Sequence, residues 1–165
     1  MRITRPSHTV TPLLGGLFGL VAALALPLLE VHDRAARADG PPGRYTAGTD
    51  ADTTPWVKDN KTGLVWKKNE EPGVFSWAAA KTQCTGGTPA WRLPNLRELQ
   101  SLVDETRAAA PTIDLTFFPG ASGGNLWSSS SGDWLASGSA WFVDFRSGGT
   151  YDDGTFNPHG VRCVR

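Results

Sequence analysis

The chain has 165 residues, and its 16 basic and 16 acidic side chains give no formal net charge at pH 7. This length fits one domain of ordinary size. A neutral balance whose densest basic spot is Lys67-Lys68 argues against nucleic acid as a partner.

The first 38 residues have the three parts of a secretory signal peptide. Arg2 and Arg5 give a basic start, and an apolar run follows over residues 13–29. That run is short and rich in glycine for a membrane span. Residues 36–38, Ala-Arg-Ala, form the small-residue pattern at which signal peptidase cleaves. We expect cleavage there, export to the periplasm or beyond the cell, and no stable membrane span afterwards. An uncleaved anchor helix is the alternative.

Residues 39–55 are rich in Gly, Pro, Thr and Asp, and they predict a flexible linker or N-terminal arm. The ordered domain is expected over 56–165. It begins with two short strands, at 56–59 and 64–67. The residues between them, Asn-Lys-Thr-Gly, predict a turn, because asparagine favours a local side-chain bond and glycine allows positive φ.

Two helices are predicted next. Ser76 suits the cap of a short helix over 77–84, which two glycines end. Asn95 and Glu98 have the spacing of a capping box at the start of the second helix. Its apolar residues recur at steps of three and four and predict one buried face: Leu96, Leu99, Leu102 and Val103.

Beyond Pro111 the pattern changes to short aromatic stretches separated by Gly, Ser and Asp. We predict strands at 126–128, 134–135, 141–145 and 161–165, with a turn at 147–149. Strands, then helices, then strands again indicate an α+β fold, in which two helices accompany a small, loop-rich antiparallel β core.

Cys84 and Cys163 are the two cysteines of the chain, and both follow the signal segment. In an exported protein an isolated pair is usually a disulfide. Such a bond would close a long loop and contribute about 4 kcal/mol by chain entropy. Free thiols or a redox pair are the alternative, which the lack of CxxC spacing disfavours.

The sequence is poor in catalytic groups. After removal of the signal, His159 is the one histidine left, and no GxSxG pattern surrounds Ser128–Ser131. P-loop, GxGxxG and HExxH patterns are missing as well. We therefore expect a protein that is not an enzyme. A glycan hydrolase that uses Asp144, Asp152 and Asp153 is the alternative. We favour the simpler interpretation that residues 151–154 form a surface turn.

The same carboxylates would suit a calcium ion, with backbone carbonyls as further ligands. We therefore name Asp144, Asp152 and Asp153 as candidate calcium ligands and expect no other cofactor. Of the seven tryptophans, those in apolar patterns are assigned to the core: Trp66, Trp77, Trp91 and Trp141. Trp134 differs because it lies on a loop-flanked stretch, where recognition residues are common. The candidate ligand-binding residues are Trp134, Asp133, Asp144, Asp152, Asp153 and Asn157.

Six stretches together resemble the Lcl C-terminal-like domain, a bacterial exported domain named for a collagen-like adhesin. These stretches are Asp59–Trp66, Trp77–Cys84, Trp91–Leu99, Leu126–Ser130, Ala140–Phe145 and Val161–Arg165. They follow in the order of that family, and the resemblance covers about 44–165.

The resemblance implies a C-type-lectin-like fold, related in shape to the formylglycine-generating enzymes, with a disulfide between the first helix and the last strand. Cys84 and Cys163 occupy the matching positions. Those enzymes use cysteines for oxidation, and no further cysteine is present here, so that activity is not implied. The adhesin's domain is associated with sulfated glycosaminoglycans. Residues 39–165 carry a slight acidic excess and no basic cluster, which disfavours a polyanionic ligand here.

We conclude from the sequence that this is an exported, non-catalytic binding module. Its β-side loops, roughly residues 117–159, would recognise a glycan or a protein at the cell surface. A structural envelope protein without a small ligand is a further alternative. The sequence indicates no particular oligomeric state.

Overall fold

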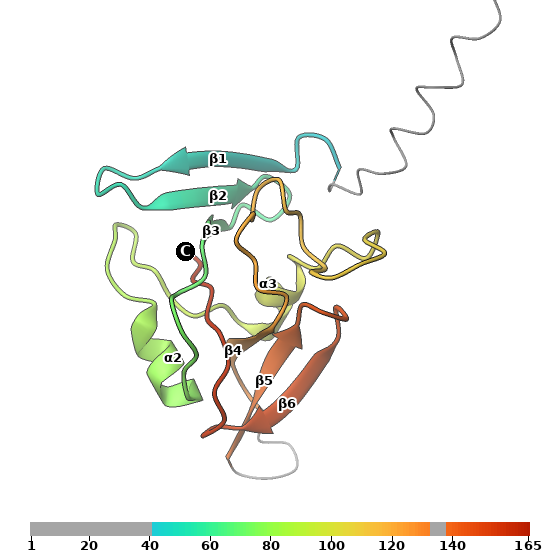
Figure 1. Cartoon of the computed structure of the whole chain (residues 1–165). Coiled ribbons are helices and arrows are strands. Elements are labelled where there is room, and N and C mark those ends of the chain that lie inside the picture. Colours follow the sequence, from blue (N-terminus) through green and yellow to red (C-terminus); the bar gives the residue numbers. More distant parts are fainter. Residues whose placement is uncertain (1–40, 133–137) are drawn as a thin grey trace, which may run out of the picture. The chain divides into compact units, whose positions relative to one another are not determined.

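The computed structural model describes residues 41–132 and 138–165, which belong to one unit of the chain, Ala38–Arg165 (Figure 1). The expected signal segment lies outside the described residues, as do Asp133 and Trp134. The described elements are β1 Tyr45–Thr49, β2 Pro55–Asp59, β3 Val65–Lys67, α2 Trp77–Gln83, α3 Leu96–Gln100, β4 Asn125–Ser131, β5 Ser139–Asp144 and β6 Thr150–Gly154. Across these residues, neither helix has the length and apolar character that a membrane crossing requires.

The first sheet is antiparallel, with the strand order β1-β2-β3. The turn predicted between β2 and β3 is confirmed: the Gly63 N–H donates to the carbonyl of Asp59 at 2.8 Å, and Gly63 has a φ of 78°. The expected linker is wrong from Tyr45 onward, because β1 pairs with β2 along its whole length. Tyr45 anchors the strand in the core by packing on Phe117 and Phe118. The other residues of β1 are small or polar and bury little apolar surface, so backbone pairing with β2 holds them in the sheet.

Both predicted helices are present, and both caps are confirmed. The Ser76 side chain accepts from the Ala79 N–H, and Asn95 and Glu98 form the reciprocal capping box. The second helix is shorter than its apolar repeat suggested. After Gln100 the α-helical hydrogen bonds give way to a tighter turn, in which the Leu102 N–H donates to the Leu99 carbonyl three residues back. Leu102 remains buried all the same.

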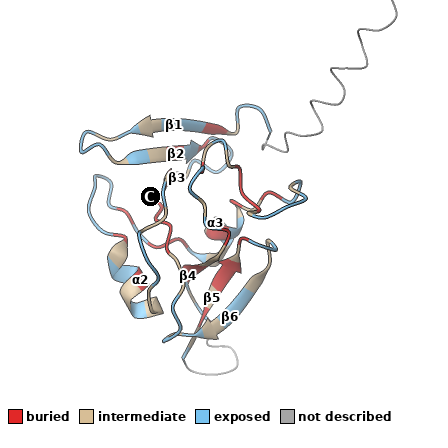
Figure 2. Ribbon diagram, in the orientation of Figure 1, coloured by how far each residue is buried: buried red, intermediate tan, exposed pale blue. Residues whose placement is uncertain are grey.

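The second sheet is also antiparallel, with the order β4-β5-β6. The turn predicted at 147–149 connects β5 to β6 and includes Gly148 at a φ of 79°. Residues 151–154, which we favoured as a surface turn, belong to β6 instead, because each pairs with a residue of β5. Figure 2 shows that buried residues concentrate in β4 and β5, while β6 is intermediate or exposed.

The last residues of the chain run between elements that are distant in sequence (Figure 1). The predicted strand at 161–165 forms isolated bridges: Val164 pairs with both Trp66 and Arg92. Just before it, the Gly160 carbonyl accepts from the Trp127 N–H at 3.0 Å. This terminal segment therefore joins β3 to the residues before α3 and to β4, although it belongs to neither sheet.

The predicted disulfide is confirmed. Cys84, directly after α2, bonds to Cys163 in the terminal segment, with Cα atoms 5.4 Å apart. The α+β class is likewise confirmed, with two three-stranded antiparallel sheets and two short helices.

The core contains two clusters of buried side chains. Trp66 and Trp91 are buried as predicted, whereas Trp77 and Trp141 are only half-buried. Trp127, which we did not assign to the core, is fully buried. Its indole N–H donates to the Phe75 carbonyl at 2.8 Å, so the ring connects β4 to the segment before α2.

Candidate functional site

Asp144 lies at the end of β5 and closes the turn that follows. Its carboxylate accepts from the Arg146 N–H and from the Ser147 hydroxyl, each at 2.8 Å. Asp153 lies opposite Ala140, near the other end of the same hairpin. Four residue steps along β5, about 13 Å of backbone, separate position 140 from Asp144. The backbone positions of Asp144 and Asp153 therefore lie near opposite ends of the hairpin.

Asp152 and Asp153 are neighbours on β6, so their side chains leave opposite faces of the strand. Asp152 is exposed. Within 41–132 and 138–165, no group of three or more His, Cys, Asp or Glu side chains is arranged to hold a metal ion. The structure thus does not bring the candidate calcium ligands Asp144, Asp152 and Asp153 together.

The structure does bring Asp153 and Asn157 together, and it adds His159. One carboxylate oxygen of Asp153 accepts from the Asn157 amide at 2.6 Å and from the Gly154 N–H at 2.7 Å. The other lies 3.0 Å from Nε2 of His159. Partial burial raises the pKa of Asp153, but these hydrogen bonds and the charge of His159 outweigh it, so the pKa lies below its ordinary value.

The ring of His159 packs against two aromatic side chains. Its centroid lies 4.3 Å from that of Trp127 and 4.7 Å from that of Phe142. Its backbone is also fixed, because His159 and Phe75 exchange two backbone hydrogen bonds. Asp153 therefore ties the end of β6 to a rigid point in the terminal segment, and it closes the residues between them into a defined loop.

This loop, residues 154–158, carries an exposed aromatic side chain and is called the Phe156 loop below. Phe156 is 93% exposed, the highest value among the large hydrophobic side chains of the described residues. Val74 and Tyr151 are also exposed, at 63% and 52%. An apolar ring in water on a braced loop is typical of a contact residue. We did not identify Phe156 from the sequence. Its position between Gly154 and Pro158, two residues typical of loops, could have indicated an aromatic side chain on a surface loop.

A groove with a volume of about 550 Å³ lies beside the Phe156 loop. We call it the loop groove. Its lining comes from the segment before α2, the residues around the start of β4, the β5–β6 turn and the terminal segment: Glu70, Glu71, Gly73, Val74, Ser122, Gly124, Asn125, Arg146, Pro158, His159 and Gly160. Most of these residues fall in or beside the β-side loops that the sequence indicated.

The charged groups of the loop groove differ in how far they are already paired. Glu70 contacts Arg162 at 3.2 Å and accepts from the Ser122 N–H at 3.2 Å, and Glu71 pairs with Lys67 at 2.7 Å. Arg146 is exposed, and its guanidinium makes no hydrogen bond or ion pair with another described residue. The groove thus offers one unpaired cation to a ligand.

A buried arginine holds the Glu70 wall of the groove in place. The side chain of Arg162 is fully buried, and its guanidinium donates to the carbonyls of Lys67 and Lys68 as well as to Glu70. It also packs over the ring of Phe118 at 4.8 Å. Burial lowers the pKa of Arg162, and the nearby Glu70 opposes that shift.

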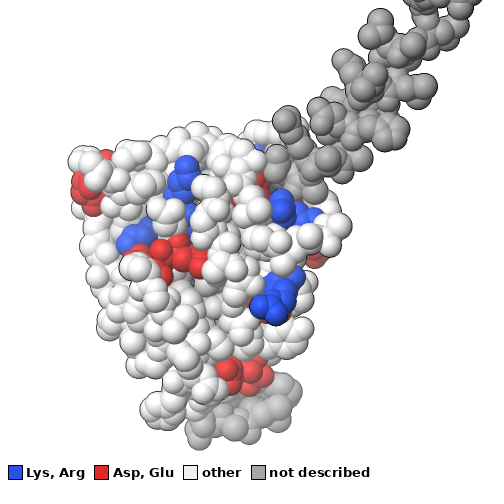
Figure 3. Space-filling view, viewed as in Figure 1, with Lys and Arg blue, Asp and Glu red and all other residues white. Residues whose placement is uncertain are grey.

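Glu70 and Glu71 also line a second, smaller hollow of about 310 Å³, together with Asp52, Lys67 and Asn69 among others. On the face shown in Figure 3, acidic and basic side chains form small neighbouring groups, with no broad area of one sign. This face of the described domain therefore presents mixed charge to a partner.

Two candidates from the sequence, Asp133 and Trp134, lie outside the described residues, and their role stays a prediction. A search of curated proteins found no match to this chain. The Lcl C-terminal domain matches residues 55–165, which is more than half of the chain. The chain therefore belongs to the Lcl C-terminal domain family.

Proposed function

We propose that this protein is an exported, non-catalytic binding module of C-type-lectin-like fold that recognises a glycan or a protein at the cell surface. Its contact surface is the Phe156 loop together with the loop groove. The disulfide supports export, because such bonds persist outside the reducing cytoplasm.

The observation that carries the proposal is the exposure of Phe156 on a braced loop. The ring is 93% exposed, while Asp153 holds the loop at its base through three hydrogen bonds. A loop whose backbone is already held in place loses little conformational freedom when a ligand binds, so more of the contact energy appears as affinity. Aromatic side chains are also frequent among the residues that dominate binding.

The loop groove supplies polar contacts beside this apolar one. Arg146 offers an unpaired guanidinium, and the side chain of Asn125 is half-buried on the groove wall. Binding is favoured over glycan hydrolysis because Asp144 and Asp153 lie at opposite ends of the hairpin. Hydrolysis needs two carboxyl groups within about 10 Å on either side of the bond.

The proposal is tested by applying the labelled full chain to a glycan array and to intact bacterial cells, with and without calcium. We expect Phe156→Ser to weaken retention about tenfold or more, as expected for a dominant contact residue. Arg146→Gln should weaken retention by a smaller factor. Trp134→Ala should also reduce capture more than it reduces the melting temperature.

Lys61→Ser is the matched control, because Lys61 is exposed in the turn between β2 and β3. It should bind as the unmodified protein does. Retention on neither glycans nor cells would contradict the proposal. Equal retention by the Phe156, Arg146 and Lys61 variants would do so as well.

A further inference from the structure

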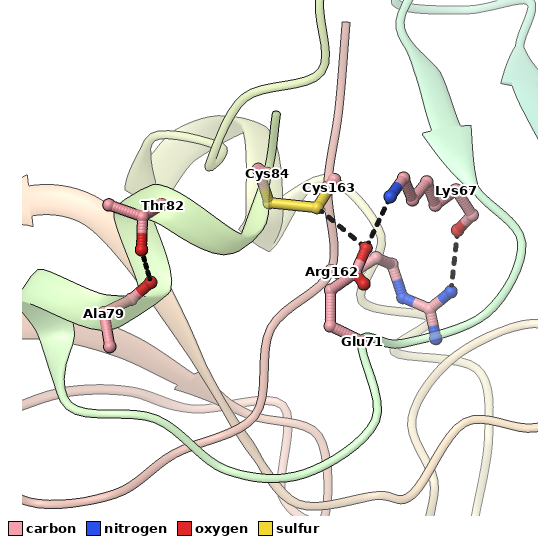
Figure 4. The surroundings of a disulfide bond; sticks show 7 residues. All are labelled: Lys67, Glu71, Ala79, Thr82, Cys84, Arg162 and Cys163. Carbon is pink, nitrogen blue, oxygen red and sulfur yellow. Dashed lines mark hydrogen bonds and ion pairs between the residues drawn. A yellow bond between two sulfur atoms is a disulfide. The ribbon is translucent and has the colours of Figure 1, made fainter. Parts of the chain in front are cut away.

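A carboxylate lies directly against the disulfide. Oε1 of Glu71 is 3.3 Å from Sγ of Cys163 and 2.7 Å from Nζ of Lys67 (Figure 4). The sulfur of a disulfide carries no proton, so it does not donate a hydrogen bond to Glu71. The contact places a negative charge beside one of the two sulfurs, and Lys67 partly compensates that charge from the other side.

The backbone keeps this arrangement in place. The Glu71 N–H donates to the Val161 carbonyl at 2.8 Å, and the Lys67 N–H donates to the Cys163 carbonyl at 2.9 Å. Arg162, between those two acceptors, binds the Lys67 carbonyl with its own side chain. Glu71 and Lys67 are thus fixed along the segment that contains Cys163, and their side chains remain only 18% and 21% exposed.

We propose that Glu71 slows the reduction of the Cys84–Cys163 bond by thiols, so that the domain keeps its disulfide where small thiols or thiol oxidoreductases are present. In the first step a thiolate attacks one sulfur, forms a mixed disulfide with it and releases the other sulfur as a thiolate. A second thiolate then attacks the mixed disulfide, which releases the first cysteine and leaves the added thiol oxidised. The added thiol is the reductant throughout.

The structure indicates which sulfur leaves. Both cysteines are buried, Cys84 at 3% and Cys163 at 0% exposure, and in this proposal the thiolate attacks the less buried Cys84. Negative charge then develops on Cys163, 3.3 Å from the Glu71 carboxylate. A like charge at this distance disfavours the charged form. A sulfur that becomes a thiolate less readily is a slower leaving group.

The experiment measures the rate of disulfide reduction by dithiothreitol in the folded full chain, followed by alkylation and mass spectrometry. We expect Glu71→Gln to be reduced about three- to tenfold faster than the unmodified protein, because the amide keeps the shape and removes the charge. Lys67→Gln should be reduced more slowly, because it leaves the carboxylate uncompensated. Glutathione should be trapped first on Cys84.

Glu98→Gln is the matched control, since that carboxylate binds Arg92 and the Asn95 N–H rather than a sulfur. Its rate should equal that of the unmodified protein. If loss of the Glu71–Lys67 ion pair merely loosened the structure around the disulfide, the bond would be reduced faster in both Glu71→Gln and Lys67→Gln. That result would overturn the proposal. So would an unchanged or slower Glu71→Gln, or rates that do not depend on thiol concentration. If Glu71→Gln does not fold, the Lys67→Gln rate decides by itself.

Discussion

The carboxylate of Asp153 accepts from the ring of His159 across 3.0 Å, and that ring packs against Trp127 and Phe142. The pair joins the end of β6 to the terminal segment. This contact is one anchor of the exposed Phe156 loop; another is the Thr155 carbonyl, which accepts from the Trp77 N–H at 2.9 Å. The ionised carboxylate of Asp153 therefore contributes to holding the Phe156 loop in place.

This dependence predicts how stability varies with pH. The folded-state pKa of Asp153 lies below its ordinary value of 3.8, so its charge stabilises the fold above about pH 5, and that contribution is lost as the pH falls through the folded pKa. Asp153→Asn should therefore melt below the unmodified protein at pH 7, and the difference should shrink toward pH 2. Thermal unfolding followed by circular dichroism at several pH values measures this. Asp152→Asn, which replaces the exposed neighbour, should melt at the same temperature as the unmodified protein at every pH. If the melting temperature of Asp153→Asn stayed equally far below that of the unmodified protein down to pH 2, the stabilising role of the Asp153 charge would be contradicted.

Replacing the buried Arg162 should be strongly destabilising. Arg162→Ala removes the partner of two backbone carbonyls and of Glu70, and uncompensated buried groups of this kind cost about 3–5 kcal/mol. Urea denaturation gives the free energy of unfolding. Arg146→Ala is the matched control, because its guanidinium is exposed and unpaired, and it should change stability by less than about 0.5 kcal/mol. Similar losses for the two variants would show that the Arg162 contacts contribute little.

Loss of the disulfide should lower the melting temperature markedly. Cys84→Ser opens a loop with a sequence separation of 79 residues, and chain entropy predicts a loss of about 4 kcal/mol. Melting curves should be recorded for both proteins under oxidising conditions and again after full reduction of the unmodified chain. Reduction should bring the unmodified protein close to the variant. Equal melting of the two proteins before reduction would refute the prediction.

The capping box of α3 should be worth a measurable amount of stability. Asn95 accepts from the Glu98 N–H at 2.9 Å, so Asn95→Ala leaves a helix N–H without that partner and should cost about 1 kcal/mol. Gln100→Ala, exposed at the other end of the same helix, serves as the comparison and should be nearly neutral. Chemical denaturation distinguishes the two. A loss at Asn95 no larger than that at Gln100 would contradict the role of the cap.

The features that the sequence by itself determined are those that neighbouring residues decide. The Ser76 cap, the Asn95–Glu98 capping box and the turn ending at Gly63 depend on side chains a few residues apart. Both the α+β order of elements and the pairing of Cys84 with Cys163 could also be predicted. A chain with two cysteines has one way to form an internal disulfide, and the family resemblance implied the same bond.

Tertiary structure decided the features that depend on distant partners. The polar segment at 45–49 becomes a strand because β2 accepts it, and residues 161–165 bridge separate elements rather than extend one sheet. Trp127 is buried and Phe156 is exposed, although both are aromatic residues beside polar ones. Hydrophobicity favours burial for both, but only the packing of the whole chain determines which ring finds a place in the core.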